Sequence, residues 1–431
     1  MLGNLRNYLF IFFLVLFPCV IGMQPLRPAF SQDFQRTPIY LRASEVIPSQ
    51  WLKGHNYMVR EKITNDGVVS TYELETVYGP LIVESTVLLL KRIHELRTLH
   101  KMEVLQEGDV FTDAAKEAAM GTFYTAKNLV IDPVRTMSEV GNGIGRFFKR
   151  LNFGTANDDP YRANALASAL GQVAVKRELA YNFGVDPYSS YSPLQETLDS
   201  LAWTAVRGSL TVKTAFSVLA FIPGGIAVVA SLTSSADSLR SLVRDKTPLE
   251  LQEINARKLA EMGVSDSIAK IFLGNSSYNP SEQTLLVGEL ASMKSAKDRV
   301  MFIIAACYAK NEQMAVSMRA MAQIMSFYNE KVEPIRGFIK AGNLPLLEKA
   351  DGTVVAIMPY DYLAWTQRFA NMERAVSDTL RRISGIREKE LLTVGVMEPK
   401  TRNILEAKGW KIRERFAEAT IQEIMAKNMK E

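Results

Sequence analysis

The sequence has few residues suited to thiol chemistry. Among its 431 residues are two cysteines, Cys19 and Cys307, and three histidines, all far upstream of Cys307. A catalytic cysteine is normally activated by a nearby base such as histidine. Cys307 stands in an apolar run, which is typical of a buried small hydrophobic residue. These features argue against a catalytic thiol, and one cysteine beyond residue 31 cannot form an internal disulfide.

Metal-binding motifs are also missing. His94 and His100 lie six residues apart, and Thr98 occupies the position four residues after His94. Two histidines on a helix bind zinc at a spacing of four, which places both rings on one face. At about 3.6 residues per turn, a spacing of six turns the second ring about 120° away. We therefore predict no metal ligands, one helix-surface histidine and one half-buried histidine.

No nucleotide or serine-hydrolase motif is present. Gly141, Gly143 and Gly145 follow a G-x-G-x-G spacing, whereas dinucleotide sites use G-x-G-x-x-G after a strand. We interpret them as small residues that permit close contact with a helix or a membrane. The nucleophile motif G-x-S-x-G does not occur. The sequence therefore predicts no cofactor, and it identifies no catalytic residue.

Three acidic residues in turn-rich stretches leave alternatives open. Asp158 and Asp159 lie in one such stretch and Asp186 in another. Loop carboxylates can bind calcium or act as an acid and base pair, but most often they turn and solvate the chain. We favour the last interpretation for all three.

The charge of the chain is mild. The formal net charge is +5, and charged residues make up 23% of the chain. A nucleic-acid partner would call for a concentrated basic face. We therefore predict no nucleic-acid binding.

The first 31 residues resemble a secretory leader. A short head with Arg6 precedes the apolar stretch Leu9–Met23, and the small residues Ala29 and Ser31 follow. This order is typical of a signal peptide that is removed on export. We expect cleavage near residue 31 and a mature protein in the periplasm or the cell envelope.

The leader has two other interpretations. An uncleaved membrane anchor needs about 20 apolar residues, and Pro18 and Gly22 interrupt this stretch. A lipid attached at Cys19 is disfavoured because Pro18 stands where a small residue is expected. The anchor remains the main alternative.

The pattern of residues predicts an α+β fold that is predominantly α-helical. After the signal peptide (1–31), we expect a β-hairpin and amphipathic helix at 32–110, a helical body at 111–345 and a small α/β region at 346–431. In the first of these, alternating residues flank the turn Asn65–Gly67. A helical period begins at Glu84, with Arg92 and Glu95 on faces other than the apolar stripe.

Helix caps and turns predict where the elements after residue 247 begin and end. Thr247, Ser265 and Asn279 each precede a helical pattern, and we expect helices to continue to about residue 341. A hairpin should turn at Asp351–Gly352. A helix over 359–382, a strand over 391–397 and a helix over 399–408 should follow, while 410–416 fits either a strand or the start of a helix.

The most apolar segment beyond the leader is 214–236, which has no charge over 23 residues. Pro223, Gly224 and Gly225 split it near its middle. We favour a helical hairpin buried in the helical body, because each arm is short for a bilayer. A transmembrane helix and a hairpin that inserts conditionally are the alternatives.

A basic amphipathic stripe at 133–151 lends some support to membrane contact. Together with the split apolar segment, it provides the candidate residues for contact with a membrane or a partner. These are Arg146, Phe147, Phe148, Lys149, Arg150, Phe221, Ile222, Pro223, Gly224 and Gly225.

These observations favour an exported, non-enzymatic protein that acts by binding, assembly or association with a membrane surface. Its expected partner is a membrane surface or another envelope protein, and its oligomeric state is open. One alternative is a membrane-inserting protein that uses 202–243 as an apolar hairpin. A second is a hydrolase with carboxylate chemistry in a cleft between the helical body and the β-containing ends.

Overall fold

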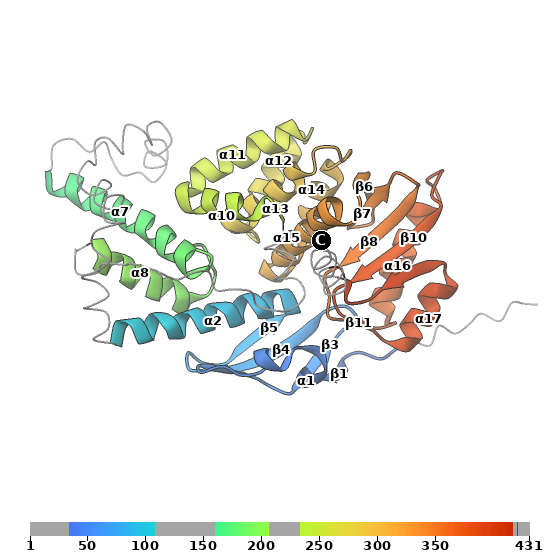
Figure 1. The fold of residues 1–431 in the computed structure, drawn as a ribbon, viewed down its shortest axis with the longest axis horizontal. Helices are drawn as coiled ribbons and strands as arrows, with labels where there is room; N and C mark the ends of the chain where they lie inside the picture. The colour runs from blue at the N-terminus through green and yellow to red at the C-terminus, as the bar shows by residue number, and fades with distance from the viewer. Residues whose placement is uncertain (1–33, 108–159, 207–232, 417–419, 421–431) are drawn as a thin grey trace, which may run out of the picture. The chain divides into compact units, whose positions relative to one another are not determined.

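The amino-terminal sheet follows the predicted alternation of apolar and polar residues. A computed structural model describes residues 34–107, 160–206, 233–416 and 420 (Figure 1). The strands of this sheet are β1 (Ile39–Arg42), β2 (Tyr57–Val59), β3 (Lys62–Asn65), β4 (Ser70–Thr76) and β5 (Leu81–Glu84). Strand β4 pairs antiparallel with β2, β3 and β5, and β1 pairs with β3. Two short helices, α1 (Ala43–Val46) and the 3-10 turn η1 (Ser49–Trp51), separate β1 from β2.

The predicted hairpin turn at Asn65–Gly67 is confirmed. The backbone N–H of Asp66 donates to the carbonyl of Val69 at 3.2 Å, and Gly67 has a φ of +101°. The turn also contacts residues far along the chain, since Ala364 N donates to Gly67 O at 3.0 Å. Thr366 Oγ1 donates to Asp66 O at 3.1 Å. The turn is therefore a docking element as well as a connection.

Helix α2 (Thr86–Glu107) confirms the predicted amphipathic helix, and its stripe from Val87 to Leu99 is buried. The helix packs against β5, α8 and α15. Arg92 and Glu95 lie on other faces, as predicted, yet they are only 5% and 1% exposed. Helix α2 is thus covered on more than one side.

The helical body contains most of the remaining helices. They are α7 (Pro160–Phe183), α8 (Ser192–Val206), α10 (Ala236–Asp245), α11 (Pro248–Glu261), α12 (Asp266–Leu273), α13 (Pro280–Ser292), α14 (Val300–Ala306) and α15 (Glu312–Lys331). The capping box at Thr247 is confirmed, because Thr247 and Glu250 bond each other's backbone N–H. Asn279 caps α13 by accepting from Glu282 N. Ser265 stands at the N-cap of α12, but its side chain makes no capping bond.

The expectation that helices continue to residue 341 is wrong. Helix α15 ends at Lys331, and Ile335–Ala341 forms strand β6. Pro334 lacks the N–H that a continuing helix needs. Strand β6 instead pairs antiparallel with β7 (Leu344–Lys349), and Phe338 is buried.

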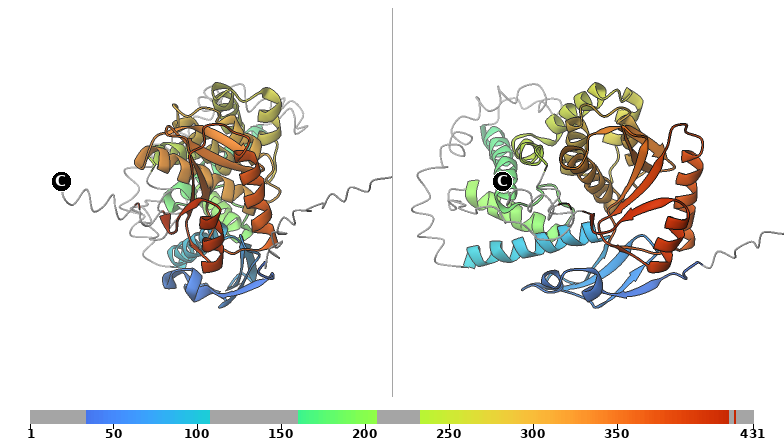
Figure 2. Two further views of the ribbon diagram at one scale, coloured as in Figure 1. Left: turned by 90° about the vertical axis from the view of Figure 1, so that its right-hand side faces the viewer. Right: turned by 45° about the vertical axis from the view of Figure 1, so that its right-hand side comes forward.

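The carboxy-terminal sheet has the order β12-β10-β8-β7-β6. Its other strands are β8 (Thr353–Met358), β10 (Glu388–Thr393) and β12 (Trp410–Arg413), and β9 (Tyr362–Leu363) pairs with β11 (Val396–Met397). The hairpin at Asp351–Gly352 is confirmed. Strand β10 runs parallel to both β8 and β12, so the segment left open at 410–416 begins as a strand. Figure 2 shows this sheet in orange and red.

The two carboxy-terminal helices are α16 (Gln367–Leu380) and α17 (Pro399–Ala407). Helix α16 begins later than the predicted residue 359, because β9 precedes it and Thr366 provides the cap. The predicted strand over 391–397 is split into β10 and β11. Helix α17 agrees with the prediction, and Gly409, at a φ of +84°, follows its end.

The predicted class, α+β with a predominance of helix, is confirmed. All ten candidate contact residues at 146–150 and 221–225, the glycines at 141–145 and the pair Asp158–Asp159 lie outside the described residues. Within the described ranges, no helix combines the length and the apolar character needed to cross a membrane.

Candidate functional site: a buried ionic junction

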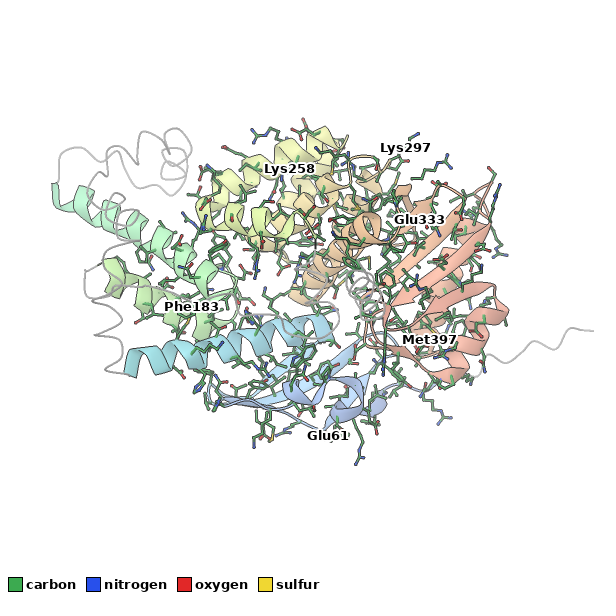
Figure 3. The ribbon with its side chains drawn as sticks, viewed as in Figure 1. Glu61, Phe183, Lys258, Lys297, Glu333 and Met397 are labelled. Atoms are coloured by element: carbon green, nitrogen blue, oxygen red, sulfur yellow. The ribbon has the colours of Figure 1, made fainter. Side chains whose placement is uncertain are left out.

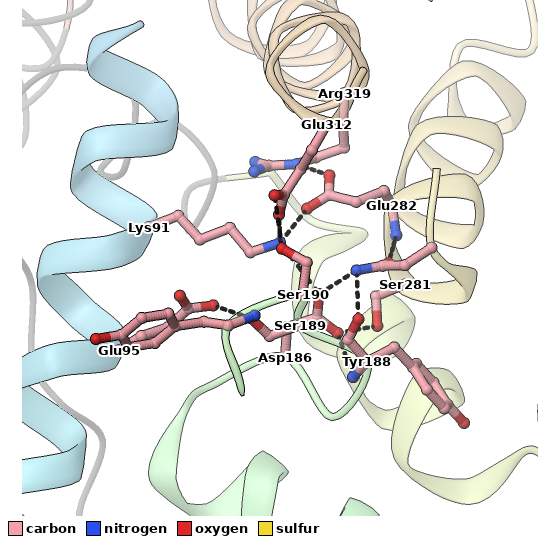
Figure 4. Close-up of polar contacts among 12 residues, drawn as sticks. Lys91, Glu95, Asp186, Tyr188, Ser189, Ser190, Ser281, Glu282, Glu312 and Arg319 are labelled. Carbon is pink, nitrogen blue, oxygen red and sulfur yellow. Dashed lines mark hydrogen bonds and ion pairs between the residues drawn. The ribbon is translucent and has the colours of Figure 1, made fainter. Parts of the chain in front are cut away.

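A group of seven charged side chains lies where four segments of the described residues meet. We call it the ionic junction (Figure 4). Helix α2, the loop 184–191 and the first turns of α13 and α15 contribute to it, together with a later turn of α15. Its charged members are Lys91, Arg92, Glu95, Asp186, Glu282, Glu312 and Arg319.

Lys91 is the central cation of the junction. Its Nζ lies 3.2 Å from Asp186 Oδ2, 3.0 Å from Glu282 Oε1 and 3.6 Å from Glu312 Oε1. Burial by itself lowers the pKa of Lys91, but Glu282 and Asp186 outweigh burial and hold the pKa above its ordinary value. Lys91 therefore stays protonated at neutral pH and cannot serve as a general base there.

Arg92 joins α2 to the loop and to α15. Its Nη1 lies 2.6 Å from Glu95 Oε2, and its Nη2 lies 2.6 Å from Glu312 Oε2. Ser189 Oγ donates to Glu95 Oε1 and Ser190 Oγ donates to Glu312 Oε2, each at 2.6 Å. Both hydroxyl protons are thus directed at carboxylates within the chain.

Asp186 is the only one of the candidate loop carboxylates that the structure describes. Its oxygens accept hydrogen bonds from Asn279 Nδ2 at 2.7 Å and from Ser281 Oγ at 2.6 Å, in addition to the Lys91 ion pair. Its Oδ1 also accepts from Tyr188 N at 3.0 Å. Asp186 therefore ties the loop to α2 and to the start of α13, and its contacts are those of a structural residue.

Local sequence places Glu282 at the junction. Asn279 caps α13, so Glu282 falls in the first turn, where the helix dipole favours a negative charge. Arg319 Nε donates to Glu282 Oε2 at 2.8 Å. Burial raises the pKa of Glu282, but the charges of Arg319 and Lys91 more than offset burial and hold the pKa at about 2. This carboxylate is ionised at any ordinary pH.

The junction holds three cations and four carboxylates. Burial raises the pKa of Glu95 above its ordinary value, although the neighbouring Arg92 and Lys91 act to lower it. Each charged group already has a partner within the chain. The arrangement is therefore suited to holding four segments together.

Sequence reasoning missed the junction apart from Asp186. One signal could have indicated it: Leu88, Leu89 and Leu90 are consecutive, so apolar residues occupy several faces of α2. A helix with apolar residues on several faces is usually covered on several sides. Charged residues within it, such as Arg92 and Glu95, then have to be paired with buried partners from other segments.

The histidine predictions can be compared with the structure directly. His94 Nε2 donates to Gly184 O at 2.9 Å, and His100 stacks on His55 with ring centroids 4.4 Å apart. His94 and His100 are both half-buried, so the prediction that one of them lies on the helix surface is wrong. In the part of the chain that is described, no three His, Cys, Asp or Glu side chains are grouped so as to hold a metal ion.

We predict that His94 makes stability depend on pH. Burial, followed by the nearby positive charge of Arg240, lowers the pKa of His94 from 6.5 to about 4. The unfolded chain therefore binds a proton more readily, and the stabilising effect of neutral His94 is lost as pH falls from about 6.5 towards 4. Between about pH 7 and pH 5 the loss should be about 2 kcal/mol. Urea unfolding at several pH values measures it.

The matched variant for this prediction is His94→Gln, which keeps an N–H donor for Gly184 O. It should show a shallower fall in stability over the same pH range. Equal pH slopes for the variant and the parent would contradict the assignment to His94.

Cys307 is a free thiol that is half-buried. Burial raises the pKa of Cys307 above its ordinary value, which disfavours the reactive thiolate. The prediction of a fully buried residue is therefore only partly met, although the thiol lies in an apolar helical region as expected.

A second polar contact joins the amino-terminal sheet to the carboxy-terminal region. Asp361 Oδ2 accepts from Tyr72 Oη at 2.6 Å and from Ser70 Oγ at 2.7 Å. Its Oδ1 is buried and has no hydrogen-bond partner in the described residues. With the Asn65–Gly67 turn, this contact fixes the sheet against residues 361–366.

Comparison of the chain with protein-family models, curated proteins and solved structures gives no match. A functional proposal for this protein therefore depends on its sequence and on the contacts of the described residues.

Proposed function

We propose that the chain is an exported, non-enzymatic protein of the periplasm or cell envelope that acts by binding a membrane surface or an envelope partner. The leader pattern at 1–31 supports the location. The mild net charge and the mixture of helices with small sheets are compatible with a scaffold that presents binding surfaces.

The observation that supports a binding role most is the internal pairing of the ionic junction. Glu95, Glu282 and Glu312 are each bonded to a cation within the chain, and Ser189 and Ser190 donate to two of them. A hydrolase with carboxylate chemistry needs acids positioned on substrate. Here the buried acids position secondary structure elements, which favours a scaffold over the hydrolase alternative.

The two segments predicted to contact a membrane are attached to one packed group of helices. In the sequence, the basic stripe at 133–151 lies between α2 and α7, and the apolar segment at 214–236 lies between α8 and the first residue of α10. Helix α7 packs against α8 and α10, and α2 packs against α8. Both segments therefore start and end on the same framework, which supports a joint role in binding.

The membrane-inserting alternative concerns 202–243, and both of its ends are packed. Ala202 is buried, and Leu239 and Val243 are buried in α10. Ahead of α10, Thr233 Oγ1 and Ser235 Oγ donate to Glu289 at 3.0 and 2.9 Å. If this segment inserts into a bilayer, the inserted part would therefore be the residues between these two packed ends.

Fractionation of cells that express the full chain with a carboxy-terminal tag tests the location. The tagged protein should be recovered outside the cytoplasm and shortened at its amino terminus, as read by mass spectrometry. A variant that lacks residues 1–31 should stay in the cytosol. Recovery of the full chain in the cytosol with Met1 intact would overturn the proposed location.

Binding is tested on the processed protein by chemical crosslinking in cells, followed by identification of the joined molecules. A lipid or an envelope protein should be joined reproducibly. Hydrolytic activity that is lost in Glu95→Gln while the fold is retained would support the hydrolase instead.

A further inference from the structure

Two large apolar side chains are exposed close to the turn that follows α14. Ile271, in α12, is 61% exposed, and Tyr308 is 49% exposed. Both belong to the helical body: Ile271 lies in α12, Tyr308 lies two residues after the end of α14, and α12 contacts α14. Exposed aromatic and aliphatic side chains that lie together often mark an interaction site.

Hydrogen bonds bring these two residues to one surface. Asn275, four residues after Ile271, donates through Nδ2 to Cys307 O at 3.3 Å and to Ala309 O at 3.0 Å. These carbonyls flank Tyr308. Asn275 follows the end of α12 by two residues, and Ile271 lies in the last turn of that helix. The end of α12 that carries Ile271 is therefore beside the turn that carries Tyr308.

Lysines surround the pair. Lys270 precedes Ile271, Lys310 follows Tyr308 by two residues, and both are exposed. Lys340, from the edge strand β6, places its Nζ 5.7 Å from the centre of the Tyr308 ring. Lys270, Ile271, Tyr308, Lys310 and Lys340 together are called the lysine patch.

None of the three lysines forms an ion pair with a carboxylate of the described residues. Lys297, exposed and labelled in Figure 3, extends the basic character along β6, where it bridges to Gly337. The patch thus has an apolar centre and a rim of lysines without ion pairs in the described residues.

We propose that the lysine patch binds the surface of a membrane that contains anionic lipids. This inference rests on the proposed function and names one surface that carries it out. Lysines attract anionic headgroups, tyrosine is favoured at the boundary between headgroups and acyl chains, and Ile271 can insert its side chain. Positive charge around an apolar centre is the combination that surface binding to such a membrane needs.

Neighbouring charge distinguishes the lysine patch from another exposed apolar residue, Ile82. Ile82 is 69% exposed, which is more than Ile271. It lies on the outer face of β5, directly across from Glu73 of β4, and Glu84 is two residues along the strand. An anionic membrane would repel these carboxylates, so Ile82 does not provide an equivalent surface.

The test is flotation of the processed protein with vesicles of phosphatidylcholine alone or with added phosphatidylglycerol. Binding should require the anionic lipid and should weaken as salt is raised. Replacing Lys270, Lys310 and Lys340 by Gln together should weaken binding on the order of 100-fold, at about fivefold for each lysine. The double variant Ile271→Ser, Tyr308→Ser should lose at least about tenfold.

Matched controls separate the patch from general charge. The triple variant Lys53→Gln, Lys62→Gln, Lys411→Gln removes the same charge elsewhere, and Ile82→Ser removes an exposed isoleucine. Both should bind within about twofold of the parent. Parent-like binding by the patch variants, with unchanged thermal transitions, would overturn the patch while leaving a membrane role intact.

Two further outcomes would also overturn the patch. One is equal binding to neutral and anionic vesicles, and the other is no flotation with either. Both leave the proposed function to be judged by fractionation and crosslinking, so the two failures are distinguishable.

Discussion

Replacing Lys91 by Met should destabilise the folded chain by about 3–5 kcal/mol, because it leaves buried carboxylates without their cation. Lys91 contacts Asp186, Glu282 and Glu312, and Glu282 is only 4% exposed. The methionine side chain has a similar length, so the loss of stability reflects the missing charge more than a change in side-chain volume. The change in the free energy of unfolding is measured by urea denaturation.

The same substitution at an exposed ion pair provides the control. Lys411 pairs with Glu388 at 2.6 Å, but its side chain is 64% exposed. Lys411→Met should therefore cost less than about 1 kcal/mol. In the double variant Lys91→Met, Glu282→Gln, part of the stability should return. Equal losses at Lys91 and Lys411 would show that the ionic junction does not depend on its central cation.

The second large effect is expected for Gly67→Ala. Gly67 has a φ of +101°, and a Cβ placed there would overlap Thr366 Oγ1 and lie 2.8 Å from Thr366 Cβ. The left-handed backbone costs about 1–2 kcal/mol for a residue with a side chain, and the forced separation adds about 1–3 kcal/mol. We therefore expect a loss of about 2–5 kcal/mol in urea denaturation.

Gly79→Ala isolates the backbone contribution. Gly79 has a similar φ of +106°, and nothing lies within 4 Å of a Cβ added to it. Its loss should stay at about 1–2 kcal/mol. If Gly67→Ala costs no more than Gly79→Ala, the turn is not pressed against Thr366 in solution.

Sequence patterns predicted the elements whose signals are local. The capping box at Thr247, the turn at Asn65–Gly67 and the buried stripe of α2 all depend on residues within a few positions of one another. Strand β6 was missed because its strand character comes from pairing with β7, whereas the residues before it are helical. Trp410 was ambiguous for the same reason, since only pairing with Lys389 of β10 makes it part of a strand.

The ionic junction could not be predicted because its members come from distant parts of the chain. Lys91 and Glu282 are 191 positions apart, and each by itself looks like an ordinary surface residue of a helix. Once both side chains are buried they have to pair with each other, because a charge that is removed from water is stable only beside an opposite charge. The contact between Ser70 and Asp361 has the same origin, at a separation of 291 positions.

The amino-acid order alone determined the mixed class of the fold, the helix caps, the tight turns and the expectation of a leader. These follow from short-range periodicity and from the backbone freedom of glycine and proline. Only the tertiary structure decided which charged residues are buried, which strands run parallel and which apolar side chains stay exposed among lysines. Those outcomes depend on what packs against each face, and distant segments supply that packing.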